Sequence, residues 1–233
     1  MLIYFWLIIM LIDELRLFYE ENSSEEKRLF DAKIINSKLK NYGIKTSILR
    51  KKAKELSINK DYLSIPRNES YENDFLLGVS MAYSKVELKE KFAFYKEFFL
   101  YVDNWSIVDS ISSTLKIKEK YYDETLLFIK EIIVSNNEFL KRFGYVLFLA
   151  NFVSENHLDD LFSLIDLKED KYYVVMAMAW LLSCAYIINT KRTYSYLKKL
   201  NKNSSLLKYT IRKVLDSYRV SKEDKELIKT LRK

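Results

Sequence analysis

The sequence contains very little glycine, proline, cysteine and histidine. Its 233 residues include three glycines and one proline, where an average globular chain of this length carries roughly 25 or more of the two together. All-β folds need glycine and proline at their hairpin turns, and phosphate-binding loops need glycines where the backbone approaches phosphate. Neither G-x-G-x-x-G nor G-x-x-x-x-G-K occurs in the chain. The scarcity therefore disfavours these folds and predicts a mostly helical protein.

The single cysteine and the single histidine narrow the chemistry further. Cys184 has no second cysteine with which to form an intramolecular disulfide, which favours a reducing, cytoplasmic compartment. His157 alone cannot make a histidine-rich metal site, and it disfavours Ser–His and Cys–His catalytic pairs. Because His157 follows Ser154 at capping spacing, we expect it at the start of a helix. We expect neither a metal nor a cofactor.

The charge of the chain is moderately basic. Lysine and arginine number 39 against 32 aspartates and glutamates, which gives a net charge of +7 and a pI of about 9.1. This excess is compatible with a nucleic acid or another anionic surface as partner. It is also common in lysine-rich proteins, so it does not identify the partner by itself.

Two apolar stretches raise the question of a membrane. Residues 1–12 lack basic residues and are followed directly by Asp13. They are therefore too short to span a bilayer and do not resemble a signal peptide. They form either an apolar first helix or an upstream extension of a protein that begins at Met10, in which case residues 1–9 are not native. Residues 172–188 contain Ser183 as their only clearly polar residue. We interpret them as a buried helix and expect no membrane partner.

Helical periodicity and cap residues predict about thirteen short helices in one all-α domain over residues 1–233. Ser23-x-x-Glu26 predicts a helix that runs to about Asn41, and Ser135-x-x-Glu138 predicts another helix start. Asp103-Asn104 are suitable caps for a helix beginning at Trp105. Further helices are expected over 47–56, 71–82, 86–101, 122–133, 173–184, 206–218 and 221–231. The pattern fits an irregular bundle or a stack of helical hairpins.

Three residues recur at the spacing of a helical repeat, and a fourth lies on the helical face of the first. Arg142 follows Trp105 by 37 residues, and Trp180 follows Arg142 by 38. This step matches one helix pair of a HEAT-type repeat, in which residues of equal phase line the same surface. Asp109 lies four residues after Trp105 and shares its helical face. We therefore expect these four residues to converge along one concave face, with Arg212 and Lys213 one step further.

Each of these residues also has an ordinary interpretation. The Trp105–Asp109 pair alone is typical of a half-buried tryptophan beside a solvated or capping aspartate. Arg142 alone would be an exposed helix arginine. Trp180 alone, in so apolar a helix, would belong to the core. The residues by themselves leave the functional face and the ordinary interpretation equally open.

The functional face would suit a cation next to a phosphate. Indole rings attract positive charge and a carboxylate neutralises it, while an arginine matches a phosphate. An N-alkylated purine nucleotide has this combination, because its base carries a positive charge. Breaking its glycosidic bond develops positive charge on the sugar, which a fixed carboxylate would stabilise.

These residues resemble the HEAT-like repeat DNA alkylation repair proteins, a family that includes monofunctional alkylpurine DNA glycosylases. The resemblance covers roughly residues 24–233. It is carried by Gly43-Ile44-Lys45-Thr46, Leu49-Arg50-Lys51-Lys52-Ala53-Lys54, Asp103-Asn104-Trp105 with Asp109-Ser110, Phe139-x-x-Arg142, the run 172–182, Ile211-x-Lys213 and Asp216-Ser217-x-Arg219.

The resemblance implies a C-shaped α-solenoid that holds duplex DNA with alkylated bases in a concave basic groove. Because solenoids are often monomers, we expect a monomer. It implies excision of 3-alkyladenine and 7-alkylguanine without base flipping. Asp109 would be the catalytic carboxylate, Trp105 and Trp180 would contact the sugar and base of the lesion, and Arg142 would bind a phosphate. Further candidates for backbone contacts, on charge alone, are Arg50, Lys51, Lys191, Arg192, Arg212 and Lys213.

Two positions depart from the pattern of the family. Ile34 stands where an aromatic residue is expected, with Phe30 one turn away, and Ser183 stands where a basic residue is expected. The family also includes proteins that bind damaged or branched DNA without excising bases. Two alternatives therefore stay open, a non-catalytic DNA-binding protein and a helical-repeat scaffold that binds other proteins.

Overall fold

The protein is all-helical, as the sequence predicts. The computed structural model describes residues 2–232, and among the first eight residues it describes the side chain of Trp6 alone. Within residues 2–232 it contains thirteen α-helices, four short 3-10 helices and no strand, with one isolated bridge between Lys40 and Ser70. The chain folds into two compact units, residues 1–116 and 117–233.

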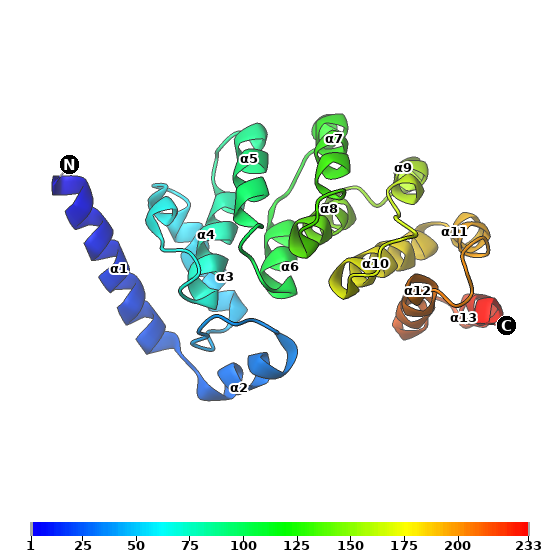
Figure 1. Cartoon of the computed structure of the whole chain (residues 1–233), viewed down its shortest axis with the longest axis horizontal. Helices are drawn as coiled ribbons and strands as arrows, with labels where there is room; N and C mark the ends of the chain where they lie inside the picture. The colour runs from blue at the N-terminus through cyan, green and yellow to red at the C-terminus, as the bar shows by residue number, and fades with distance from the viewer. Residues whose placement is uncertain (1, 233) are drawn as a thin grey trace. The chain divides into compact units, whose positions relative to one another are not determined.

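The first unit is built around one buried helix. Its helices are α1 (Leu2–Asn22), α2 (Glu25–Ile34), α3 (Thr46–Leu56), α4 (Tyr71–Tyr83), α5 (Leu88–Phe98) and α6 (Trp105–Thr114), with η1 (Asp61–Ser64) between α3 and α4 (Figure 1). Helix α4 contacts α3, α5 and α6, and every residue from Tyr71 to Ala82 is buried. Large aromatic side chains such as Phe75, Tyr95 and Phe99 fill the space around it. Burial of this apolar surface is the main stabilising contribution to the unit.

Helix α2 ends much earlier than its sequence predicts. Its cap is Ser24, which accepts from the Lys27 N–H at 3.3 Å, and the helix stops at Ile34 rather than near Asn41. Residues 35–45, which we call the connecting segment, form no helix. The backbone N–H groups of Lys38, Tyr42 and Gly43 donate to carboxylates from other parts of the unit instead. These alternative partners explain why the predicted boundary is wrong.

The second unit is also arranged around a central apolar helix. Its helices are α7 (Tyr122–Ile132), α8 (Glu138–Asn151), α9 (Leu158–Ser163), α10 (Tyr172–Ile188), α11 (Thr190–Leu197), α12 (Ser205–Asp216) and α13 (Lys222–Lys229), with η2 (Glu119–Tyr121), η3 (Glu155–His157) and η4 (Thr230–Arg232). Helix α10 contacts α8, α11 and α12 and most of its residues are buried. The interpretation of residues 172–188 as a buried helix is confirmed. In residues 2–232 no helix is both long and apolar enough to cross a membrane.

Of two predicted helix starts in this unit, one differs from the structure in its cap residue and the other is confirmed. Helix α8 is capped by Asn137, whose side chain accepts from the Phe139 and Leu140 N–H groups, so the predicted capping by Ser135 is wrong. Asn137 rather than Ser135 caps the helix because an Asn side chain directly before the first turn reaches those groups. His157 ends η3 and directly precedes α9, so its expected place at a helix start is confirmed.

The succession of contacts within each unit is compatible with a helical repeat. Helices two places apart pack together, as α4 does with α6, and α10 with both α8 and α12. A continuous C-shaped solenoid, its concave basic groove and the single domain over 1–233 stay predictions. Most of the predicted apolar segment 1–12 lies outside the described side chains.

Candidate functional site

Helix α6 carries the predicted Trp105–Asp109 pair. Trp105 is its first residue, because the buried Asn104 caps the helix by accepting from the Ile107 N–H at 3.2 Å. Asp109 follows one turn later, and both side chains are half-buried. The structure therefore places an indole ring and a carboxylate on one helical face of the first unit, as the spacing predicts.

The indole of Trp105 is anchored to the end of helix α2. Its Nε1–H donates to the carbonyl oxygen of Ile34 at 3.0 Å. Ile34 itself is 46% exposed, and Phe30 one turn earlier is 55% exposed. The position that departs from the family pattern thus contributes its backbone carbonyl to the orientation of Trp105.

The last turn of α6 is held by Arg50 from helix α3. The guanidinium donates to the Ser110 carbonyl at 3.3 Å and to the Ser113 hydroxyl at 3.0 Å, and it also bonds to Thr114. Arg50 is half-buried, whereas its neighbour Lys51 is exposed. The two residues predicted together as phosphate contacts therefore differ: Arg50 supports the helix that carries Asp109, and Lys51 faces solvent.

Two buried carboxylates on helix α4, of which Glu72 supports the connecting segment, were missed by the sequence analysis. Glu72 is fully buried and accepts from the N–H groups of Tyr42 at 3.0 Å and Gly43 at 3.1 Å. Burial raises its pKa, and the backbone donors partly offset this rise. Asp74 accepts from the Asn68 N–H at 3.0 Å, and burial raises its pKa to about 6. The signal that could have found them is two acidic residues in an otherwise apolar helical run.

In the second unit, Arg142 is buried rather than exposed. Its side chain is in helix α8 with 6% exposure, and its Nη1 donates to the Tyr173 carbonyl in the first turn of α10 at 2.8 Å. Glu138 of α8 accepts from the Tyr173 N–H at 2.8 Å. The interpretation of Arg142 as an ordinary exposed arginine is wrong, because a buried guanidinium is fixed by its partners.

Trp180 lies against a lysine from the neighbouring helix. The Nζ of Lys213, in α12, is 5.7 Å from the centroid of the Trp180 ring, a cation–π distance. Both side chains are half-buried. Ser183, the second departure from the family pattern, donates its hydroxyl to the Trp180 carbonyl at 2.7 Å. The structure thus brings together two residues that the repeat spacing placed in successive steps.

The remaining predicted contacts are on the surface of the second unit. Lys191, Arg192 and Arg212 are exposed. Arg192 forms ion pairs with Asp159 and Glu155, and Arg212 lies 3.9 Å from Asp216. Exposed ion pairs of this kind contribute little to stability, so these side chains can exchange partners at small cost.

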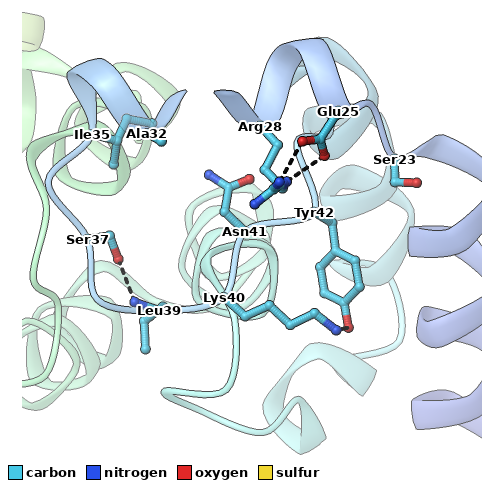
Figure 2. Close-up of a pocket in the computed structure, with 10 residues that line it drawn as sticks. All are labelled: Ser23, Glu25, Arg28, Ala32, Ile35, Ser37, Leu39, Lys40, Asn41 and Tyr42. Carbon is cyan, nitrogen blue, oxygen red and sulfur yellow. Dashed lines mark hydrogen bonds and ion pairs between the residues drawn. The ribbon is translucent and has the colours of Figure 1, made fainter. Parts of the chain in front are cut away.

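A cleft of about 710 Å³ opens beside helix α2 in the first unit. Figure 2 shows its wall, formed by α2 and the connecting segment, with Arg28 turned toward Glu25 and Lys40 reaching the hydroxyl of Tyr42. None of the residues drawn there belongs to the predicted site. In residues 2–232 no cluster of three or more histidine, cysteine, aspartate or glutamate side chains is arranged to hold a metal ion.

Comparison with known proteins gives one match. The model of a protein family described as DNA alkylation repair enzyme matches residues 15–215. No curated protein and no solved structure shows a significant match. The matched range covers most of the chain and includes Trp105, Asp109, Arg142 and Trp180.

Proposed function

Because the chain belongs to the DNA alkylation repair enzyme family, we propose that it is a DNA glycosylase. Its substrates are N-alkylated purines with a positively charged base, such as 3-alkyladenine and 7-alkylguanine, in duplex DNA. The observation that carries this proposal is the Trp105–Asp109 pair on one face of α6, held at both ends of the helix by Ile34 and Arg50. A fixed carboxylate beside an aromatic ring suits a reaction that develops positive charge.

The reaction breaks the bond between C1′ of the sugar and the alkylated base. The base takes the bonding electrons and leaves as a neutral purine, so no strong general acid is required. Asp109 stabilises the positive charge that develops on the sugar and orients the water that adds to C1′. The proton that this water loses passes to Asp109 or to solvent.

Trp105 contributes the face of its ring. Its only hydrogen-bonding atom already donates to Ile34, so its interaction with a cationic nucleotide is through the π-system. Contact by a ring face does not require a pocket that encloses an extruded base. We therefore propose excision without base flipping.

The second unit contributes DNA contacts of its own. We propose that Arg142 binds a backbone phosphate and that Trp180 contacts the lesion nucleotide. The burial of Arg142 supports this role, since a charged hydrogen bond is stronger in a low-dielectric site than in water. Further contacts to the DNA backbone, whose phosphates attract cations, are proposed for the exposed Lys51, Lys191, Arg192 and Arg212 and for the half-buried Lys213.

The test is release of methylated purines from alkylated duplex DNA. The wild-type protein is expected to release them, and Asp109→Asn is expected to slow release by about 100-fold or more. Asp123→Asn, at an exposed position on α7, is the matched control and should release bases at the wild-type rate. No release by folded wild-type protein would refute the glycosylase.

A second candidate is a DNA-binding protein of the same family without activity. The Lys213 ammonium near the Trp180 ring favours it, because an internal cation already interacts with the aromatic surface. This candidate predicts salt-sensitive binding to damaged or branched DNA that is unchanged in Asp109→Asn. Binding that is indifferent to salt would contradict both candidates.

A further inference from the structure

The orientation of Trp105 depends on a contact that its own helix does not provide. Its indole Nε1–H is the only hydrogen-bonding atom of the side chain, and it is bound to the Ile34 carbonyl at 3.0 Å. Ile34 is the last residue of α2, where the chain leaves the helix for the connecting segment. The ring of Trp105 is therefore oriented by whatever fixes the start of that segment.

Asp103 fixes the start of the connecting segment through the Lys38 N–H. Its Oδ2 accepts from the Lys38 N–H at 2.7 Å, and its Oδ1 accepts from the side-chain amide of Asn104 at 3.1 Å. A hydrogen bond to a carboxylate is shorter and stronger than one between neutral groups. Both carboxylate oxygens of Asp103 are thus engaged.

Two short stretches of chain are therefore joined twice. Ile34 and Lys38 are four residues apart, and Asp103 and Trp105 are two residues apart. One link runs from the Trp105 indole to Ile34, and the other from the Lys38 N–H to Asp103. This closed ring of contacts keeps the Ile34 carbonyl within hydrogen-bonding distance of the indole.

The rest of the connecting segment is attached elsewhere. The Tyr71 N–H donates to the Lys40 carbonyl at 2.8 Å, and Glu72 binds the N–H groups of Tyr42 and Gly43. Figure 2 shows how the segment runs from Ile35 past Ser37 and Leu39 to Tyr42. The first half of the segment, up to Lys38, therefore depends on Asp103. The second half, from Lys40 to Gly43, depends on α4.

We propose that Asp103 is a positioning residue for Trp105. It touches neither the substrate nor the water, and it acts by holding the carbonyl that orients the indole ring. The role in excision rests on the proposed glycosylase function, but the effect on Trp105 does not. Without the carboxylate, Ile34 and its carbonyl move away from α6, and the indole turns out of its place beside Asp109.

The experiment isolates Trp105 by its fluorescence. The chain has three tryptophans, so Trp6→Phe with Trp180→Phe leaves Trp105 as the only one. In this background, Asp103→Ala is expected to shift the emission to longer wavelength and to increase quenching by acrylamide, because the indole loses its anchor. Asp103→Asn keeps an acceptor for the Lys38 N–H and should restore most of the original signal.

Two further variants make the result decisive. Asp123→Ala, at the exposed position on α7, should leave the emission of Trp105 unchanged. Asp103→Glu keeps the charge but moves the carboxylate by one methylene, and it should shift the emission less and in the same direction. This variant tests the proposal even when Asp103→Ala does not fold. Unchanged emission and quenching in folded Asp103→Ala would overturn the proposal.

Activity provides a separate readout in the otherwise wild-type chain. Asp103→Ala is expected to lower kcat by up to about 100-fold, with a smaller change in KM, as misplacement of a catalytic element does. If the wild-type protein releases no bases, the glycosylase fails while the fluorescence result still decides the role of Asp103. If bases are released and Asp103→Ala changes neither emission nor kcat, the positioning role alone fails.

Discussion

Gly43 offers the sharpest test of how the connecting segment is built. It is buried and has a φ of +76°, in the left-handed region that side chains rarely adopt. A Cβ at this position would lie 2.2 Å from the Ser24 carbonyl oxygen and 2.6 Å from the Arg28 nitrogen. Both are backbone atoms at the start of α2. Gly43→Ala therefore requires the segment and α2 to separate.

The expected cost combines two contributions. The left-handed backbone costs a residue with a Cβ about 1–2 kcal/mol. Separation also weakens the 3.1 Å hydrogen bond from the Gly43 N–H to the buried Glu72, and loss of such a bond costs about 1–3 kcal/mol. The sum is about 2–5 kcal/mol, a large share of the 5–15 kcal/mol that stabilises a typical domain.

The assay is urea unfolding followed by circular dichroism. Gly43→Asn separates the two contributions, since asparagine tolerates the left-handed backbone but still carries a Cβ, and we expect it to remain destabilised. Lys60→Gly is the matched control, because Lys60 is exposed with a φ of 61°. Relief of strain there should stabilise the protein by about 1 kcal/mol. A decrease of less than about 1 kcal/mol in the free energy of unfolding of Gly43→Ala would refute the reasoning.

Three further predictions follow from the contacts of single side chains. Lys51→Ala should reduce the salt dependence of DNA binding by about one unit of slope without changing Tm, whereas Arg50→Ala should lower the free energy of unfolding by about 1–3 kcal/mol. Asp74 has an ordinary pKa of 3.8, raised to about 6 in the folded protein. The folded state therefore binds the extra proton, and the free energy of unfolding should fall by about 2 kcal/mol as pH rises from 4 to 6. Asp74→Asn should remove this dependence when unfolding is measured across the same range. Lys91 is buried, burial lowers its pKa, and it donates to two carbonyls at the end of α4. Lys91→Met should lower Tm, because those carbonyls lose their donor.

The helices that form the two cores could be predicted from sequence because their signals are local. Helix α4 and the start of α6 have apolar periodicity and their own cap residues, and both agree with the structure closely. The end of α2 could not be predicted. It is decided by the distant carboxylates Glu72 and Asp103, which bind backbone N–H groups that would otherwise continue a helix.

The candidate site shows the same division between local and distant determinants. The shared face of Trp105 and Asp109 follows from their spacing of four residues on one helix. The partner of the indole does not, because the Ile34 carbonyl is 71 residues away. Lys213 could be placed near Trp180 by repeat spacing, but its cation–π distance required the structure. The support of α6 by Arg50 could not be predicted, since an arginine in a basic run has the sequence signature of a phosphate contact.

The connecting segment is held through its backbone, and this has a consequence for how the sequence can diverge. Every residue except proline has a backbone N–H, so other substitutions at Lys38 and Tyr42 leave these hydrogen bonds intact. The constraint falls on Asp103 and Glu72, which lie elsewhere in the chain. Among relatives, we expect the segment, apart from Gly43, to vary in sequence while the two acids that bind it stay fixed. Conservation of Glu72 in α4 and of Asp103 before α6 would then indicate the conformation of a segment that contains neither residue.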